Sequence, residues 1–346
     1  MNREPTKNMN RIGITTTVPI EVLLAAGYQP VDLNNVFITA PNPERLIIIA
    51  EKVGFPLNCC GWIKGIYGVC MDSGIDTVLC VTTGDCSNTL MLMEVLKLKG
   101  LKVVPFAYPD QPDVRRMQSA LEALAEAVGT TMEAAGRIRE TLMPCRRLAL
   151  ELDRLTWQDD VVSGWENHLW MVSTSDFNQD YHRYQSELEK VLADCSRRQP
   201  YPSDWLRIAY IGVPAVYGQD LYHYLEGHGA RVVFNEIQHQ FAMPRPGNSL
   251  AKQYTNYTYP YSVYDRVKDI TAELNQRQVD GVIHYVQAFC HRGIGDIIFR
   301  DALKLPILTL EGNDDFQLTH HVRTRVEAFL DMLVRQRRKQ RMASRL

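Results

Sequence analysis

Residues 76–88 read DTVLCVTTGDCSN, and this stretch contains the pattern that decides the fold. An apolar run from Asp76 to Thr82 leads into a turn-rich segment, and a helical run from Thr89 to Lys97 follows. Short apolar runs bounded by Gly, Asn and Asp that alternate with helical segments are typical of a parallel sheet covered by helices. The stretch therefore predicts one strand–loop–helix unit of an α/β fold.

The same alternation occurs twice along the chain, with four expected strands each time. The first set is Arg11 to Thr15, Val31 to Ile38, Asp76 to Thr82 and Lys102 to Phe106, and the second is Arg207 to Val213, Arg231 to Asn235, Gly281 to Val286 and Pro306 to Leu310. Between the sets, about Gln111 to Arg198, Leu, Ala, Glu and Arg recur at helical spacing without a strand pattern. We therefore predict a first α/β lobe over residues 1–110, a helical connecting segment over 111–203, and a second α/β lobe over 204–346 that ends in a helix from about Asp315 to Arg338.

The composition of the 346 residues is that of an ordinary globular protein, with 38 basic against 40 acidic side chains and a net charge of -2. This balance gives no general attraction to nucleic acid or to an anionic membrane surface. The start, Met1 to Arg11, has no apolar run that could serve as a signal peptide, and the longest apolar runs are too short to span a bilayer. We therefore expect a cytoplasmic protein with no nucleic-acid and no membrane partner.

Three cysteine positions lie in loops that lead toward helices. Cys86 follows the third strand of the first lobe, Cys290 follows the third strand of the second lobe, and the pair Cys59-Cys60 precedes a helical run that begins near Gly61. Ligands of open α/β sheets gather at such loops, and a helix N-terminus lowers the pKa of a nearby thiol and favours the thiolate that binds metal. The pattern indicates a metal or cluster site, with incidental cysteines as the alternative.

The remaining cysteines have simpler explanations. Eight cysteines in 346 residues are too sparse for a disulfide scaffold. Cys80 lies inside an apolar strand, and Cys70, Cys145 and Cys195 lie in helical segments, so we interpret all four as packing residues. The chain has no Cys-x-x-Cys pair, which gives no support to a zinc ribbon.

Two histidines lie where a metal ligand could be expected. His291, beside Cys290, offers a nitrogen that could complete a zinc site of three sulfurs and one nitrogen, although a polar loop residue is the simpler interpretation. His284 alternates with apolar residues in the third strand of the second lobe, which is typical of a hydrogen-bonded core histidine. We assign no catalytic role to it.

Two further segments indicate weaker functional hypotheses. The loop from Val213 to Gly218, after the first strand of the second lobe, is a place where a substrate or a phosphate could be bound. The aromatic segment from Tyr254 to Tyr261 lacks interleaved basic residues, which disfavours nucleic-acid stacking and predicts a surface loop or a subunit contact. No dinucleotide, P-loop or nucleophile-elbow motif is present.

Five stretches, found in this order over most of the chain, together carry a family resemblance. They are Cys60-Gly61-Trp62-Ile63-Lys64 with Gly68, Gly84-Asp85-Cys86, Asp280-Gly281-Val282-Ile283 with Phe289-Cys290, Leu308-Thr309-Leu310-Glu311-Gly312, and Arg323-Thr324-Arg325-Val326-Glu327-Ala328-Phe329-Leu330. The set resembles the 2-hydroxyacyl-CoA dehydratase family, which includes the cluster-bearing subunits of benzoyl-CoA reductases and the double-cubane cluster proteins.

The resemblance implies two flavodoxin-like lobes, each a four-stranded parallel sheet with flanking helices, and a low-potential four-iron four-sulfur (4Fe-4S) cluster in the cleft between them. It implies three cysteine ligands and one open iron. Carried onto this sequence, the cofactor-binding and metal-binding residues are Cys60, Cys86 and Cys290. Cys59 is the alternative to Cys60, and the motif spacing to Lys64 favours Cys60.

The resemblance also implies partners and a reaction class. Family members pair with a similar subunit, as a homodimer or a heterodimer, and receive single electrons from an ATP-dependent iron–sulfur activator. The implied activity is that of a lyase or an oxidoreductase. It is either dehydration of a 2-hydroxyacyl-CoA through a ketyl radical or reduction of small molecules at a bridged double-cubane (8Fe-9S) cluster. The alternatives are a two-lobed small-molecule binding module and an electron-transfer protein without its own catalysis.

Overall fold

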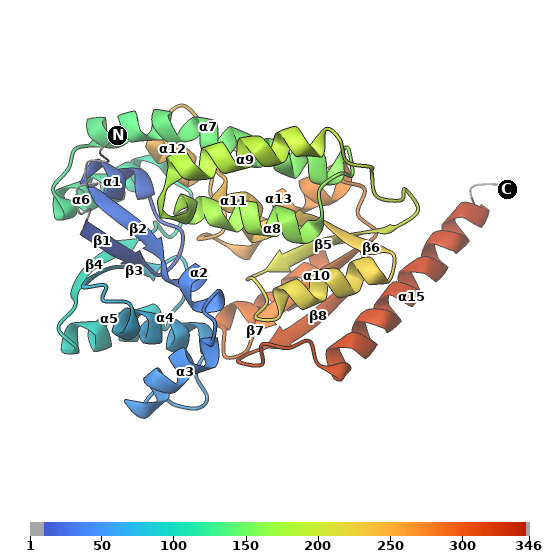
Figure 1. The fold of residues 1–346 in the computed structure, drawn as a ribbon, viewed down its shortest axis with the longest axis horizontal. Coiled ribbons are helices and arrows are strands. Elements are labelled where there is room, and N and C mark those ends of the chain that lie inside the picture. The colour runs from blue at the N-terminus through green and yellow to red at the C-terminus, as the bar shows by residue number, and fades with distance from the viewer. Residues whose placement is uncertain (1–9, 344–346) are drawn as a thin grey trace, which may run out of the picture. The chain divides into compact units, whose positions relative to one another are not determined.

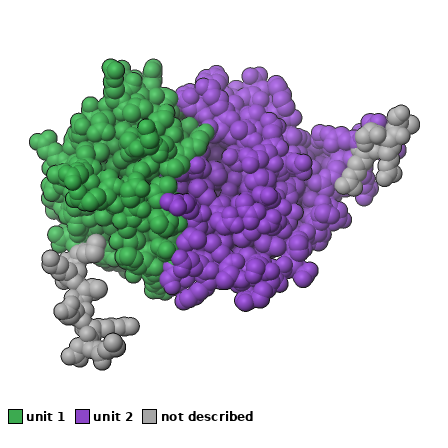
Figure 2. Space-filling view, turned by 90° about the horizontal axis from the view of Figure 1, so that it is seen from above, with its two compact units in different colours: residues 1–146, 173–185, 245–261 green, residues 147–172, 186–244, 262–346 purple. Residues whose placement is uncertain are grey.

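The chain forms two compact units in a computed structural model that describes residues 10–343. Unit 1 comprises residues up to Arg146 together with Ser173–Gln185 and Arg245–Tyr261, and unit 2 comprises Arg147–Val172, Ser186–Pro244 and the residues from Ser262 onward (Figure 2). The polar start from Met1 to Arg11, for which we expect no signal peptide, lies outside the described residues up to residue 9.

Unit 1 is built around a four-stranded parallel sheet in the order β2-β1-β3-β4 (Figure 1). Its strands are β1 Asn10–Ile14, β2 Tyr28–Asp32, β3 Thr77–Thr83 and β4 Lys102–Ala107; its helices are α1 Ile20–Ala25, α2 Leu33–Ile38, α3 Pro43–Lys52, α4 Gly61–Asp72, α5 Thr89–Leu98, α6 Val114–Val128 and α12 Leu250–Thr255. In the central strand β3 the first five residues are all buried, as expected of a parallel strand covered on both faces.

Unit 2 repeats this plan with a four-stranded parallel sheet in the order β6-β5-β7-β8. Its strands are β5 Leu206–Gly212, β6 Ala230–Asn235, β7 Gly281–Gln287 and β8 Ile307–Gly312; its helices are α8 Gly164–Val172, α10 Gly218–Gly227, α11 Glu236–Phe241, α13 Val263–Gln276, the 3-10 turn η3 His291–Gly295, α14 Asp296–Ala302 and α15 His320–Ala343. Its apolar core includes Ile211, Val233, Ile270, Val282 and Phe299. The predicted α/β class with two flavodoxin-like lobes is confirmed.

The stretch between the two sheets is helical, as predicted. Besides α6 and α8 it contains α7 Met132–Trp157, the 3-10 turns η1 Ser173–Ser175 and η2 Phe177–Gln179, and α9 Tyr181–Cys195. Helices α7 and α9 each contribute residues to both units. All strands of the first sheet precede residue 111 and all strands of the second follow residue 203.

The predicted strand from Val31 to Ile38 is wrong in its second part, because β2 ends at Asp32 and α2 begins at Leu33. The Asp32 carboxylate accepts a hydrogen bond from the Asn34 N–H (2.9 Å), so this residue caps a helix. Leu33 and Phe37, spaced by four, are the buried residues of α2. The apolar run thus follows the helical period rather than the strand period.

The ends of the C-terminal helix also differ from the prediction. Helix α15 begins at His320 and extends to Ala343, whereas Asp315 lies in a turn where its carboxylate accepts the Gln317 N–H (3.2 Å). The Thr319 hydroxyl accepts the Val322 N–H (3.4 Å) and marks the helix start.

The prediction of a surface loop from Tyr254 to Tyr261 is wrong, because the four tyrosines of this segment are buried. Tyr254 belongs to α12, and its hydroxyl donates to the carbonyl oxygen of Val18 (2.9 Å) and to Glu21 Oε2 (2.7 Å). The Tyr261 hydroxyl donates to the Tyr254 carbonyl oxygen (3.3 Å). The phenols of Tyr254 and Tyr261 therefore reach polar partners while their rings are packed in unit 1.

Both sheets have their first and third strands side by side, β1 with β3 and β5 with β7. The connections from these neighbouring strands lead to opposite sides, and the loops at their carboxyl ends are where ligands bind in sheets of this type. The segments that follow β3 and β7 contain Cys86 and Cys290.

Candidate functional site

The Cys86 loop is fixed by a close approach of the backbone at Gly84. Gly84 has a φ of +96°, and a Cβ atom there would lie 2.8 Å from Tyr108 Cβ and 2.9 Å from Pro260 Cβ. Only glycine combines this conformation with this contact. Two residues later the Cys86 carbonyl oxygen accepts the Thr89 N–H (3.1 Å), and α5 begins. Cys86 therefore lies half-buried in a constrained turn at the start of a helix.

The Cys59-Cys60 pair directly precedes α4, as predicted. Cys60 is the N-terminal flanking residue of this helix and is buried, whereas Cys59 is half-buried. Burial raises the pKa of the Cys59 thiol, and the Lys64 ammonium opposes that increase. Both cysteines remain candidates for one ligand position.

A buried lysine holds the loop before these cysteines. The Lys64 side chain is almost fully buried, and its Nζ donates to Glu51 Oε1 (2.7 Å) and to the Leu57 carbonyl oxygen (3.1 Å). In the next turn of the helix, a Cβ atom on Gly68 would lie 2.2 Å from the Leu46 carbonyl oxygen, so α3 and α4 approach each other through a glycine. The sequence showed Lys64 and Gly68 within one motif but gave no signal for these contacts.

Helices α4 and α5 lie in contact in unit 1 (Figure 1). Cys60 precedes one of them and Cys86 precedes the other by three residues. Both cysteines therefore lie in loops directly before the N-termini of two neighbouring helices. Backbone N–H groups at such N-termini favour a thiolate.

The Cys290 loop of unit 2 connects β7 to α14. Phe289 has a φ of +61°, a conformation that bulky residues rarely adopt. The Cys290 N–H donates to the Gln287 carbonyl oxygen (3.1 Å), and the Cys290 carbonyl oxygen accepts the Gly293 N–H (3.0 Å) as η3 begins. Cys290 is half-buried at this start of η3.

His284 and Asp296 join the two ends of this region. His284 is a buried residue of β7, and its Nδ1 donates to Asp296 Oδ1 (2.6 Å) at the start of α14. The interpretation of His284 as a hydrogen-bonded core histidine is confirmed. The role of Asp296 could not be predicted from the sequence, because His284 lies twelve residues away and only the tertiary fold brings the two side chains together.

The cysteines interpreted as packing residues lie in protected positions. Cys80 in β3 and Cys70 in α4 are buried, and burial raises the pKa of each thiol to about 12. Cys145 and Cys195 are buried in α7 and α9. The raised pKa values of Cys70 and Cys80 fit thiols that stay protonated and serve as packing residues.

Within residues 10–343, no group of three or more His, Cys, Asp and Glu side chains is arranged as a metal site. Cys60 and Cys86 belong to unit 1 and Cys290 belongs to unit 2. Their assignment as one ligand set, like the zinc alternative with His291, stays a prediction. In donor chemistry the three residues fit an iron–sulfur cluster, since each is a thiol in a loop that leads into a helical segment.

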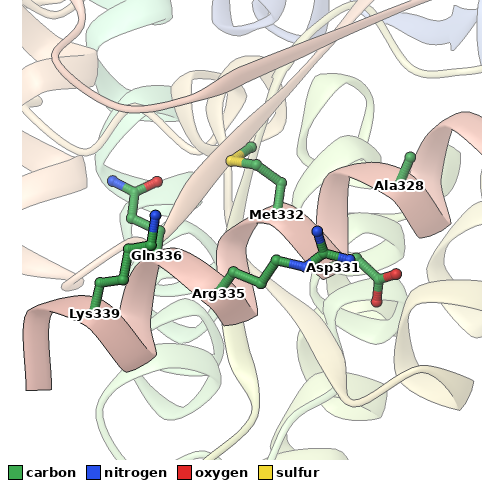
Figure 3. A pocket seen from close by; sticks show the side chains of 6 residues that line it. All are labelled: Ala328, Asp331, Met332, Arg335, Gln336 and Lys339. Carbon is green, nitrogen blue, oxygen red and sulfur yellow. The ribbon is translucent and has the colours of Figure 1, made fainter. Parts of the chain in front are cut away.

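A surface pocket in unit 2 contains none of these residues. It is lined by one face of α15, with Met332 between Asp331 and Arg335 and with Lys339 one turn further along (Figure 3). Met332 is partly exposed there. Its basic side chains, Arg335 and Lys339, are exposed on the surface of α15.

The chain matches the family model described as 2-hydroxyglutaryl-CoA dehydratase, D-component, over residues 15–333. The chain belongs to this family. The match covers every described strand except β1 and all three cysteine loops, and it confirms the resemblance to the 2-hydroxyacyl-CoA dehydratases. No curated protein matches the chain. Among residues 10–343, no helix combines the length and the apolar character needed to cross a membrane.

Proposed function

We propose that this dehydratase-type component binds a 4Fe-4S cluster through Cys60, Cys86 and Cys290 and removes water from a 2-hydroxyacyl-CoA. The observation that carries the proposal is the equivalent placement of Cys86 and Cys290. Each follows the third strand of its sheet, next to the first strand, where connections diverge and ligands bind. Family membership over residues 15–333 supports the substrate class.

When bound, such a cluster supplies single electrons at low potential and one iron that can hold an oxygen ligand. The chain's own contribution is to present three thiolates from rigid loops. Gly84 fixes the turn that precedes Cys86, Lys64 holds the backbone before Cys60, and η3 begins directly after Cys290. Backbone N–H groups at these helix starts stabilise negative charge on sulfur.

The proposal includes two kinds of protein partner. A similar subunit, identical or not, would complete the working assembly, and an ATP-dependent iron–sulfur activator would deliver the electron. Dehydration consumes no net electron, because the electron that enters the substrate thioester is recovered when the 2-enoyl-CoA forms. One activation therefore supports many turnovers.

Iron and acid-labile sulfide per chain, measured on protein purified without oxygen, test the cluster. We expect about four irons per chain, the content of one cubane. Sulfide in excess of iron would instead indicate the bridged double-cubane form and its reductive chemistry. Iron near zero after anaerobic reconstitution would overturn the cluster and leave a binding module.

Single substitutions test the ligand set. Cys60→Ala, Cys86→Ala and Cys290→Ala should each lose most of the iron, whereas Cys80→Ala, which removes a buried thiol of β3, should retain it. Cys59→Ala decides between the two neighbouring cysteines. Full iron in Cys86→Ala or Cys290→Ala would remove that residue from the set.

Incubation of the loaded protein with a 2-hydroxyacyl-CoA, ATP, an activator and a low-potential reductant for that activator tests the reaction. We expect a 2-enoyl-CoA, detected by mass spectrometry. A reduced, loaded protein that passes electrons to acceptors but leaves every 2-hydroxyacyl-CoA unchanged would favour the electron-transfer alternative.

A further inference from the structure

The backbone of the Cys290 loop is strained at the residue before the cysteine. Phe289 has a φ of +61°, and its side chain is 53% exposed. A left-handed conformation costs a residue with a Cβ atom about 1–2 kcal/mol, and an exposed ring recovers little of that cost by packing. Other contacts must therefore hold the loop in this conformation.

Asp296 supplies a set of such contacts from three elements. Its Oδ1 accepts hydrogen bonds from His284 Nδ1 in β7 (2.6 Å) and from the Thr309 hydroxyl in β8 (2.8 Å). Its Oδ2 accepts Arg300 Nε in α14 (2.7 Å), and Arg300 also donates to Thr309. Burial alone would raise the pKa of Asp296, but these hydrogen bonds outweigh burial and hold it well below its usual range. The carboxylate thus ties α14 to both neighbouring strands.

The loop between β7 and α14 is also tied at its first residues. The Ala288 N–H donates to the Gly312 carbonyl oxygen (2.8 Å), and Gln287 Nε2 donates to the Asn313 carbonyl oxygen (2.9 Å). These bonds fix the start of the loop to the end of β8, and Asp296 fixes its other end. Residues 289–295 span the two anchors, and Cys290 lies within them.

We propose that Asp296 is a positioning residue that, through His284 and Thr309, holds the loop over residues 288–295 in its strained form and thereby sets the position of the Cys290 sulfur. Without the carboxylate, α14 loses its bond to His284 in β7 and keeps only the bonds of Arg300 to β8, and the backbone at Phe289 relaxes toward negative φ. Only the effect of Asp296 on a bound cluster rests on the proposed function. The restraint of Cys290 is a property of unit 2 alone.

The matched control is Asp280, at the opposite end of β7. Its carboxylate accepts the Arg207 N–H (2.8 Å) and two bonds from Arg337, and it is 21% exposed against 19% for Asp296. The two carboxylates thus have similar exposure and similar numbers of donors, and both contact β7 or its flank. They differ in position, because Asp280 directly precedes β7, whereas Asp296 follows the Cys290 loop as the first residue of α14.

Alkylation of Cys290 in the metal-free protein, followed by mass spectrometry, tests the inference without a cluster. We expect the rate in Asp296→Ala to rise by roughly tenfold or more, with Asp296→Asn between it and the unsubstituted protein, because local opening exposes the thiol. Asp280→Asn should change the rate by less than about twofold. An unchanged rate in both Asp296 variants, or an equal rise in Asp280→Asn, would overturn the inference.

The cluster provides a second readout. In protein loaded without oxygen, Asp296→Asn should change the electron paramagnetic resonance spectrum or the reduction potential of the cluster, and Asp280→Asn should change neither. Identical spectra and potentials in Asp296→Asn and the unsubstituted protein would show that Asp296 does not position the ligand. Failure of the unsubstituted protein to bind iron would overturn the proposed function, while the alkylation rates would still decide the role of Asp296.

Discussion

Units 1 and 2 share a strand order and a cysteine after the third strand, yet one buried carboxylate in each unit, Asp176 and Asp153, lies in an opposite electrostatic environment. In unit 1, the Asp32 N–H donates to Asp176 Oδ2 (2.8 Å), and burial together with the negative Asp32 raises the pKa of Asp176 to about 7. In unit 2, burial would raise the pKa of Asp153, but the Arg277 guanidinium and the His239 ring outweigh it and hold the pKa far below its usual range. The shared topology places equivalent loops at equivalent strand ends. The side chains around each buried carboxylate, in contrast, set its pKa and therefore how the stability of each unit depends on pH.

The largest difference between the units should come from Asp153→Asn. The Asp153 carboxylate accepts Arg277 Nη1 (2.9 Å) and Nη2 (2.6 Å) and Asn167 Nδ2 (2.9 Å). Removing one charge of a buried pair leaves the other uncompensated and costs about 3–5 kcal/mol. We expect the free energy of unfolding of unit 2, measured by urea denaturation, to fall by this amount.

Glu151→Gln on the same helix is the control. Glu151 pairs with Arg154 (2.8 Å), but the side chains are 46% and 36% exposed. Exposed pairs contribute at most about 1 kcal/mol. A loss for Asp153→Asn no larger than that for Glu151→Gln would contradict the view that unit 2 depends on buried pairing.

Acid should destabilise unit 2 next, through His168. Burial lowers the pKa of His168 from 6.5 to about 3, and its Nδ1 lies 2.9 Å from Gln238 Nε2. A neutral folded histidine contributes stability that is present above its unfolded pKa and is lost as the pH falls. The expected loss is about 1.4 kcal/mol for each pH unit below about 6.5.

Urea denaturation between pH 7 and pH 5 measures this loss, with His168→Asn as the comparison. Asn keeps an acceptor near the Gln238 amide but does not titrate. The variant should show a shallower decline with falling pH. Equal slopes for the two proteins would remove His168 as the source of the acid sensitivity.

The fold and the cysteine loops could be predicted from the sequence because their signals are local. Short apolar runs such as Asp76 to Thr82 marked the strands, and a cysteine follows the third strand of each sheet. The extent of β2 could not be predicted, because the apolar run after it fits a strand as well as a short helix until the Asp32 cap decides.

The restraints around the cysteines could not be predicted, because they depend on tertiary contacts. The bond between His284 and Asp296 joins residues twelve positions apart. The positive φ of Phe289 contradicts the local preference of its residue type and is imposed by closure of the loop. The pairing of Asp32 with Asp176, 144 residues apart, has no local signature either.

A smaller effect is expected when the restraint of the unit 1 cysteine loop is removed. Lys64→Met fills the same buried space but loses the bonds to Glu51 and to the Leu57 carbonyl oxygen. Glu51 is 28% exposed and can be hydrated, so we expect a loss of only about 1–2 kcal/mol.

Hydrogen exchange of residues 57–60 in Lys64→Met should nevertheless accelerate, because this loop loses its anchor. Exchange of the Cys290 loop in unit 2 is the internal reference and should stay unchanged. Acceleration in both loops would show that Lys64 supports the whole chain rather than one loop.

The effect whose sign is most informative is expected for Asp176→Asn. Because the folded pKa of Asp176 is raised to about 7, the stability linked to its protonated form is present at acid pH and is lost as the pH rises through that value. Asn keeps an acceptor for the Asp32 N–H but carries no charge. The variant should therefore gain about 1.4 kcal/mol relative to the unsubstituted protein for each pH unit between pH 5 and pH 7. Urea denaturation at each pH measures the free energy of unfolding, and hydrogen exchange of unit 1 peptides shows whether the gain lies in unit 1. A relative loss at pH 8 would mean that the charged carboxylate stabilises unit 1 as Asp153 does unit 2, and the contrast between the units would fail.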